Sequence, residues 1–249
     1  MFRVCLKISG LVALLLLVAC NRQHDPVPEH VYQIYPIQEG KQRTYAVTDT
    51  LYETTNSSGF EARRYLRREI NEGFETDLLD REVAKLFIYI SPDSSDTNGN
   101  PFVNFRYEEL WTQYSGDVYA ERIEGNIRNL VLKVPAQEGL KWNGALYASL
   151  DGHPYPYSNH IYEYTTVDTT VTVQGVTYDN CVFVLKVPFR ENGEIAPQRF
   201  YIKEYAYEIY APRIGMIVRH EQSKVYQGLD LQADQSWYLH EELTEHTFE

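Results

Sequence analysis

Runs of alternating apolar and polar residues recur along this chain, and they constrain its fold more than any other feature. In an extended strand such alternation places the apolar side chains on one face. The runs are rich in valine, threonine and tyrosine, which favour half-buried strands, and the chain contains 21 tyrosines. We therefore predict strands at residues 44–53, 85–91, 102–111, 128–134, 169–173, 180–187, 199–210 and 214–220.

Turn-forming residues separate these runs. Gln174-Gly175 lies between two valine-rich segments and predicts a tight hairpin. Pro135 and Pro188 each follow the sequence VLKV, and they predict strand ends because proline cannot donate to a strand ladder. Gly215 follows a reversal at Pro212-Arg213 and predicts a bulge or a close approach of backbone. Further reversals are predicted at Asn98-Gly99, Asn143-Gly144 and Asn192-Gly193.

Residues 60–70, FEARRYLRREI, fit both the residue spacing of a helix and the alternation of a strand. A helix would gather Arg63, Arg64, Arg67 and Arg68 on one face, whereas a strand would divide them between two faces. The arginines could form a basic patch for an anionic glycan or lipid. A solvated face balanced by neighbouring glutamates is the interpretation that we favour.

The first twenty residues have the layout of a secretory leader. Arg3 and Lys7 precede an apolar stretch at 8–18 that is too short to span a bilayer. The sequence LVAC at 17–20 resembles the lipobox of bacterial lipoproteins, in which the cysteine is acylated and becomes the first mature residue. The resemblance implies a signal peptide at 1–19 and a lipidation site at Cys20 that carries fatty acyl chains such as palmitate. Residues 20–40, with three prolines, would form a tether.

Charge and cysteine content exclude several classes of function. The chain has a net charge of −12, and removal of the leader with its two basic residues leaves 21 basic against 35 acidic residues. Such a surface repels nucleic acid, so we expect no nucleic-acid partner. After lipidation only Cys181 remains as a thiol, which rules out an internal disulfide. Its apolar surroundings indicate a buried hydrophobe rather than a nucleophile.

The familiar motifs of enzymes and metal sites are absent from the sequence. Residues 93–100, DSSDTNGN, fail as a calcium loop because Ser94 and Phe105 occupy its first and twelfth positions. Thr244 stands where a zinc-binding helix would need a second histidine after His240. We find no nucleophile elbow, phosphate loop or dinucleotide fingerprint. We therefore predict no catalytic residues, no metal and no cofactor.

The loop at 151–160, DGHPYPYSNH, gives weak candidates for ligand binding. Its histidines and tyrosines could line a binding loop, although a tyrosine-rich turn packed on the domain is the commoner outcome. These candidates are His153, Tyr155, Tyr157 and His160. The tripeptides DTL and DTT, around Thr50 and Thr169, are similar to the short O-glycosylation motif of Bacteroidetes extracytoplasmic proteins. Such tripeptides are common by chance, so we assign no glycan to them.

Four longer stretches, at 35–47, 128–144, 171–184 and 208–221, resemble a group of uncharacterised lipoproteins from the Bacteroidetes. Ala211-Pro212 departs from the pattern, which otherwise has a polar residue after the alanine. The resemblance implies an all-β domain at 41–249 with few or no helices. It further implies a single, strongly curved antiparallel sheet, an open half-barrel similar to that of periplasmic lipoprotein carriers. The expected location is the cell envelope, in the outer membrane, on its periplasmic or surface face.

Together these features predict a membrane-anchored envelope lipoprotein that is not an enzyme. Its curved sheet would present a tyrosine-lined concave face to an apolar, glycan or protein ligand. A first alternative is an envelope glycan hydrolase, which would need two carboxylates in a cleft. A second alternative is a structural subunit of an envelope complex, which would show a broad exposed apolar patch.

Overall fold

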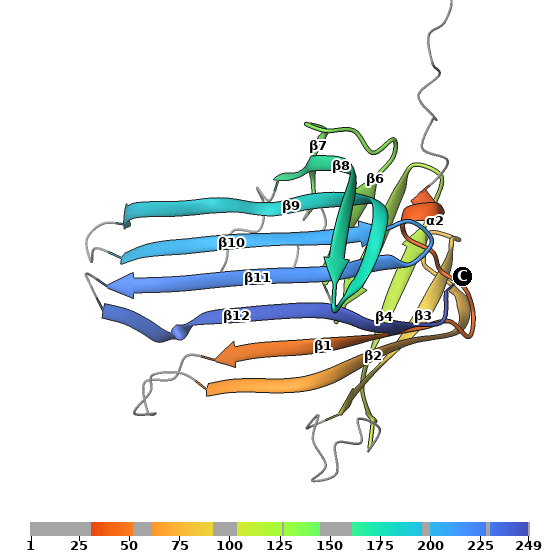
Figure 1. Ribbon diagram of the computed structural model, residues 1–249, viewed down its shortest axis with the longest axis horizontal. Coiled ribbons are helices and arrows are strands. Elements are labelled where there is room, and N and C mark those ends of the chain that lie inside the picture. Colours follow the sequence, from red (N-terminus) through yellow and green to blue (C-terminus); the bar gives the residue numbers. More distant parts are fainter. Residues whose placement is uncertain are drawn as a thin grey trace, which may run out of the picture.

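The chain folds into one twelve-stranded antiparallel sheet (Figure 1). This computed structural model describes residues 31–51, 61–91, 104–125, 127–144, 161–195, 200–227 and 230–248. The strands lie side by side in the order β6-β5-β4-β3-β2-β1-β12-β11-β10-β9-β8-β7. Helix in these ranges is limited to the four-residue α2 (Val31–Ile34). The predicted fold class, a single curved all-β sheet, is confirmed.

The strand bounds show two groups of different length. Strands β3 to β7 have ten residues or fewer, whereas β9 and β12 have 20 and 17. The strands are β1 (Gln42–Leu51), β2 (Glu61–Thr76), β3 (Glu82–Ser91), β4 (Arg106–Ser115), β5 (Tyr119–Glu124), β6 (Ile127–Lys133), β7 (Lys141–Asn143), β8 (Ile161–Val173), β9 (Val176–Ile195), β10 (Phe200–Ala211), β11 (Gly215–Gln227) and β12 (Asp230–His246). In Figure 1 strands β9 to β12, β1 and β2 reach farther to the left than the others, although β1 has only ten residues.

The sheet curls until its edge strands β6 and β7 nearly meet, leaving one seam without a strand ladder. A few hydrogen bonds cross this seam. The Leu130 amide donates to the Gly144 carbonyl at 2.8 Å, and Trp142 Nε1 donates to the Leu130 carbonyl at 2.8 Å. The Tyr164 hydroxyl donates to the Lys133 carbonyl at 2.6 Å. The side chains of Trp142 and Tyr164 thus bond to some of the free carbonyls at the edge of β6, which could otherwise pair with a further strand.

The β8–β9 hairpin folds over the outer face of β10 to β12 (Figure 1). Its turn is at Gln174-Gly175, as predicted, and both residues have positive φ, as a tight hairpin of this type requires. Tyr178 and Cys181 of the hairpin share the main apolar core with Ile209 and Val218. The outer face of the sheet is therefore covered at this end.

Several predicted boundaries differ from the structure. Strand β9 runs through both Pro188 and Asn192-Gly193, so the predicted strand end and reversal there are wrong. The register of β9 against β10 skips between Val187 and Arg190, which accommodates a proline without an amide hydrogen. Within the predicted tether at 20–40, Ile34, Tyr35 and Pro36 are buried, while residues 38–40 are exposed. Asn98-Gly99 lies outside the described residues.

Gly215 occupies the close approach that its sequence position predicts. Its φ is +95°, and a side-chain Cβ there would lie 3.0 Å from the Arg43 guanidinium. Neighbouring β10 and β11 also change register between Ile209 and Tyr210. Glycine is needed here because it alone combines that backbone angle with room for the arginine.

Candidate functional site

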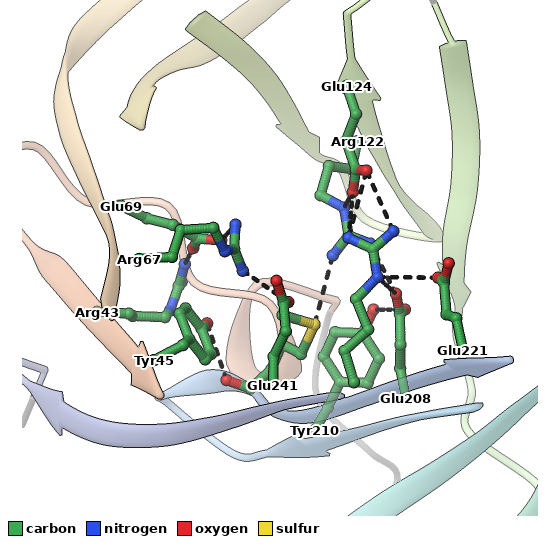
Figure 2. A network of polar contacts seen from close by, with 12 residues as sticks. Arg43, Tyr45, Arg67, Glu69, Arg122, Glu124, Glu208, Tyr210, Glu221 and Glu241 are labelled. Atoms are coloured by element: carbon green, nitrogen blue, oxygen red, sulfur yellow. Dashed lines mark hydrogen bonds and ion pairs between the residues drawn. The ribbon is translucent and has the colours of Figure 1, made fainter. Parts of the chain in front are cut away.

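The inner face of the curled sheet carries charged side chains as well as rings. Arg122 of β5 contacts Glu208 of β10, and because these strands are not neighbours the contact must cross the interior. Along β1 the inward residues are Arg43, Tyr45 and Val47, all buried. Figure 2 shows these groups gathered in one network. We call the ion-paired residues of this interior the inner network. They are Arg43, Arg67, Glu69, Arg122, Glu124, Lys186, Glu208, Arg219, Glu221 and Glu241.

The first half of the inner network joins β1, β2 and β12. Arg67 donates to Glu69 and to Glu241, each at 2.8 Å, and Arg43 donates to Glu69 at 3.1 Å. The Arg67 guanidinium also lies 4.8 Å from the ring centre of Tyr45, a favourable cation–π distance. These charges are nearly inaccessible to water, since none of the four side chains is more than 5% exposed.

The second half joins β5, β9, β10 and β11 around Glu208. This carboxylate accepts hydrogen bonds from Arg122 at 2.7 Å, from Lys186 at 3.1 Å and from the Tyr210 hydroxyl. Arg219 extends the network to two further carboxylates. It donates to Glu221 at 2.8 Å and to Glu124 at 3.0 Å. Arg219 Nε also lies 3.8 Å from Glu208, so this carboxylate pairs with cations of β5, β9 and β11.

Buried charges of opposite sign balance within the inner network. Burial alone raises the pKa of Glu208, but Arg122, Lys186 and Arg219 outweigh it and hold the pKa well below its usual range. Glu221 responds in the same way, with its pKa lowered to about 2. Glu69 and Glu124 also have lowered pKa values because nearby arginines outweigh their burial. These carboxylates are thus ionised and fully engaged, which indicates a structural role.

Glu241 is the exception among these carboxylates. Burial raises its pKa, and the attraction of Arg67 does not fully offset that effect. A raised pKa is a property of general acids. However, Glu241 is only 3% exposed and its carboxylate is bound to Arg67. A substrate could reach it only if the inner network opened.

Beyond the network, the inner face of the long strands reaches solvent. Asp49 and Arg63 form an ion pair across β1 and β2, and the Arg63 side chain is 48% exposed. Trp237 of β12 is 39% exposed. Strand register places Leu239 opposite Asp49, and Tyr65 opposite Val47, so Trp237 is the diagonal neighbour of Asp49 on this face. We call Asp49, Arg63, Tyr65, Trp237 and Leu239 the open patch.

The neighbouring Asp49 carboxylate affects Tyr65. Burial raises the pKa of Tyr65, and the charge of Asp49 raises it further. The open patch therefore combines an exposed indole, a phenol, an aliphatic side chain and a charged pair. A surface of this kind offers apolar contact together with directional hydrogen bonds.

The outer face carries a row of rings across four strands. Phe183 stacks on Tyr207 with ring centres 4.7 Å apart, and Tyr207 stacks on His220 at 5.1 Å. His220 then contacts His240 at 5.5 Å. Burial lowers the pKa of His220, and the neighbouring His240 lowers it further, so His220 is neutral at pH 7. In the described ranges no group of three or more histidine, cysteine or acidic residues is placed to hold a metal.

The structure locates only some of the residues singled out from the sequence. Cys20, His153, Tyr155, Tyr157 and His160 lie outside the described residues. Thr50 lies in β1 and Thr169 lies in β8, both paired with neighbouring strands.

Cys181 is fully buried in the main core. Burial raises the pKa of its thiol to about 11, so the thiolate needed for nucleophilic attack is scarce at neutral pH.

The open patch escaped the sequence analysis. Asp49 falls in a predicted strand. Tyr45, Val47 and Asp49 stand at every second position, and this spacing indicates that the three side chains share one face. Trp237 lies in β12, which was not predicted as a strand. The pairing of β1 with β12, which brings the two residues together, has no local signal.

Comparison with known proteins adds no function. No known protein family matches the chain, and neither does any curated protein or solved structure. Within the described part of the chain, no helix is both long and apolar enough to cross a membrane. The site must therefore be interpreted from its own geometry.

Proposed function

We propose that this protein is a lipid-anchored lipoprotein of the bacterial cell envelope that binds a glycan on the open patch without catalysing a reaction. The observation that carries the proposal is the exposed Trp237 close to the Asp49–Arg63 ion pair, on the same face of the sheet as the buried inner network. The anchor is proposed from the lipobox resemblance at Cys20, and the outer membrane from the resemblance to Bacteroidetes lipoproteins.

A glycan suits the open patch better than the other ligands considered. A sugar ring has an apolar face of C–H groups that can lie on an indole, and hydroxyls that can bond to a carboxylate and a guanidinium. An apolar ligand would leave the Asp49 and Arg63 charges without water or a polar partner, which is costly. The tyrosines that line the deeper inner face are packed rather than open, with Tyr45, Tyr164 and Tyr210 at 0% exposure.

The hydrolase alternative receives less support. Its two carboxylates would need access to a glycosidic bond. The inner carboxylates Glu208, Glu221 and Glu241 are instead held by arginine and lysine side chains. Asp49 is likewise held in an ion pair, by the Arg63 guanidinium.

Trp237 provides a direct test of glycan binding. We expect its fluorescence to change when the purified lipoprotein, in mild detergent, is titrated with solubilised peptidoglycan fragments or with chito- and cello-oligosaccharides. Trp237→Ala should lower the affinity about ten- to a hundredfold, because burying a large apolar side chain contributes roughly 1.5–3 kcal/mol. Calorimetry on both proteins measures that loss independently of fluorescence.

Tyr107 supplies a matched control for this titration. It is 53% exposed, more than Trp237, but lies on β4 outside the open patch. Tyr107→Ala should leave glycan affinity unchanged, whereas Asp49→Asn should weaken it. Equal affinities of Trp237→Ala and the unchanged protein for every glycan tested would refute the open patch as the binding site.

The lipid anchor has its own test. The intact mass of protein extracted from membranes should correspond to a chain that begins at Cys20 and carries acyl chains, without residues 1–19. Fatty-acid release by alkaline hydrolysis should account for part of the added mass. A chain that retains Met1, or one cleaved elsewhere and free of lipid, would remove the basis for membrane attachment.

A further inference from the structure

The turn between β2 and β3 displays two adjacent leucines to solvent. Leu78 is fully exposed, at 104% of its reference area, and Leu79 is 61% exposed. Val118, in the neighbouring β4–β5 turn, is 59% exposed. Single exposed apolar residues are common, but three large ones on adjacent turns are a candidate contact surface. We call Leu78, Leu79 and Val118 the apolar tip.

The backbone that carries these leucines is strongly braced. Asp77 accepts hydrogen bonds from the Leu79 amide at 2.8 Å and from the Arg81 amide at 3.0 Å. The Arg81 side chain bonds back to Asp77 at 2.7 Å and reaches β5, where it bonds to Glu121 at 2.8 Å. The turn is thus tied to the sheet by charged hydrogen bonds, so the leucines are held outward by a fixed backbone.

The apolar tip lies at the end of the sheet where the chain enters it. Arg81 bonds to the Tyr119 hydroxyl at 3.0 Å, which joins the β2–β3 turn to the start of β5. Helix α2 packs beside β5, and Tyr35, just after it, accepts a hydrogen bond from Gln113 near the end of β4. In Figure 1, α2 and the C-terminus lie together at the right, opposite the free ends of the long strands.

The length of chain before α2 limits how far the α2 end of the domain can lie from a membrane that holds Cys20. Eleven residue steps separate Cys20 from Val31, and a fully extended chain covers at most about 38 Å in that distance. Strand β12 alone, with 17 residues, spans roughly 55 Å. An anchor at Cys20 therefore holds the α2 end within about 38 Å of the bilayer, whereas no such limit applies to the far ends of the long strands.

We propose that the apolar tip inserts into the bilayer that holds the lipid anchor and so fixes the orientation of the domain. This proposal rests on the lipidation of Cys20 in the proposed function. The surface that the apolar tip contacts is the interfacial region of the bilayer, not a cluster of charged headgroups. Asp80 and Asp117, both exposed, flank the leucines and disfavour an anionic surface. The orientation would leave the long strands and their open patch pointing away from the membrane.

Spin labels at Leu78 can measure this insertion. The Leu78→Cys variant of the lipidated protein would be labelled with a nitroxide and reconstituted in phosphatidylcholine vesicles, with flotation to verify attachment. We expect the label to be several-fold more accessible to oxygen, which partitions into lipid, than to a water-soluble nickel complex. Cys181 is buried and should label poorly, and unsubstituted protein measures that background.

Tyr107→Cys is the matched control. Tyr107 is also exposed but lies eight residues from the end of β4, roughly 26 Å from the β4–β5 turn, and its label should favour the nickel complex. If the protein floats but both labels are more accessible to the nickel complex than to oxygen, the proposed insertion is wrong and the lipid anchor is retained. A label at position 78 shielded from both reagents would indicate a protein partner and overturn insertion. Protein that does not float would overturn the anchor and the insertion together.

Discussion

Glu208→Gln is expected to destabilise the protein by about 3–5 kcal/mol, the usual cost of removing one partner from a buried ion pair. Glu208 is 0% exposed and contacts Arg122 and Lys186 directly. A neutral amide of the same shape leaves these cations with one negative charge too few, in an interior that water does not reach. Urea unfolding followed by circular dichroism, with both proteins in the same detergent, measures the difference.

Glu241→Gln is the matched comparison for that change. Glu241 is equally part of the inner network, but its pKa is raised, which means that the fold disfavours its ionised form. A glutamine removes that penalty and can still accept the hydrogen bond from Arg67. We expect a loss of no more than about 1 kcal/mol. Equal losses of unfolding free energy for Glu208→Gln and Glu241→Gln would show that the ionised form of Glu241 is as important to the fold as that of Glu208.

The sequence was most informative where valine-rich or tyrosine-rich alternation flanks a clear turn signal. The end of β8, the first half of β9 and their turn at Gln174-Gly175 were predicted because valines alternate on both sides of a turn pair. The β10–β11 hairpin, with its close approach at Gly215, was visible for similar reasons. In these segments local composition, period and turn chemistry agree with the final structure.

Strands β2 and β12 were harder to predict. In β2 the inward positions include Arg67 and Glu69, so its alternation is not one of apolar and polar residues, and helix and strand remained equally open. The structure shows a strand that divides the arginines, with Arg67 buried and Arg64 exposed. Strand β12 was not predicted because Glu241 occupies one of its buried inward positions.

Long-range pairing determines the candidate site, and a single sequence does not encode it visibly. Arg67 and Glu241 are 174 residues apart, and Arg122 and Glu208 are 86 apart. Each arginine viewed locally looks like a surface residue, which is why a solvated face was the favoured interpretation of residues 60–70. Only the pairing of β1 with β12 and the curling of the whole sheet turn these charges inward.

Acidification is expected to unfold the protein between about pH 4.5 and 2. Glu69, Glu124, Glu208 and Glu221 all have pKa values below those of an unfolded chain, with Glu221 at about 2. A carboxylate with a lowered pKa contributes stability that is complete above its unfolded pKa and is lost as pH falls through its folded pKa. Glu241, whose pKa is raised, has the opposite effect on the pH dependence of stability, but the four carboxylates with lowered pKa values outnumber it.

Urea midpoints measured from pH 7 to pH 2 test this dependence. The midpoint should be nearly constant down to about pH 5 and then fall steeply, since ordinary glutamates titrate near 4.3. Glu221→Gln lacks one of the titrating groups, so its midpoint should start lower at pH 7 and decline less on acidification. A midpoint that stays level down to pH 2.5 would mean that the inner carboxylates do not depend on their ionised form for stability, contrary to the charge balance of the network.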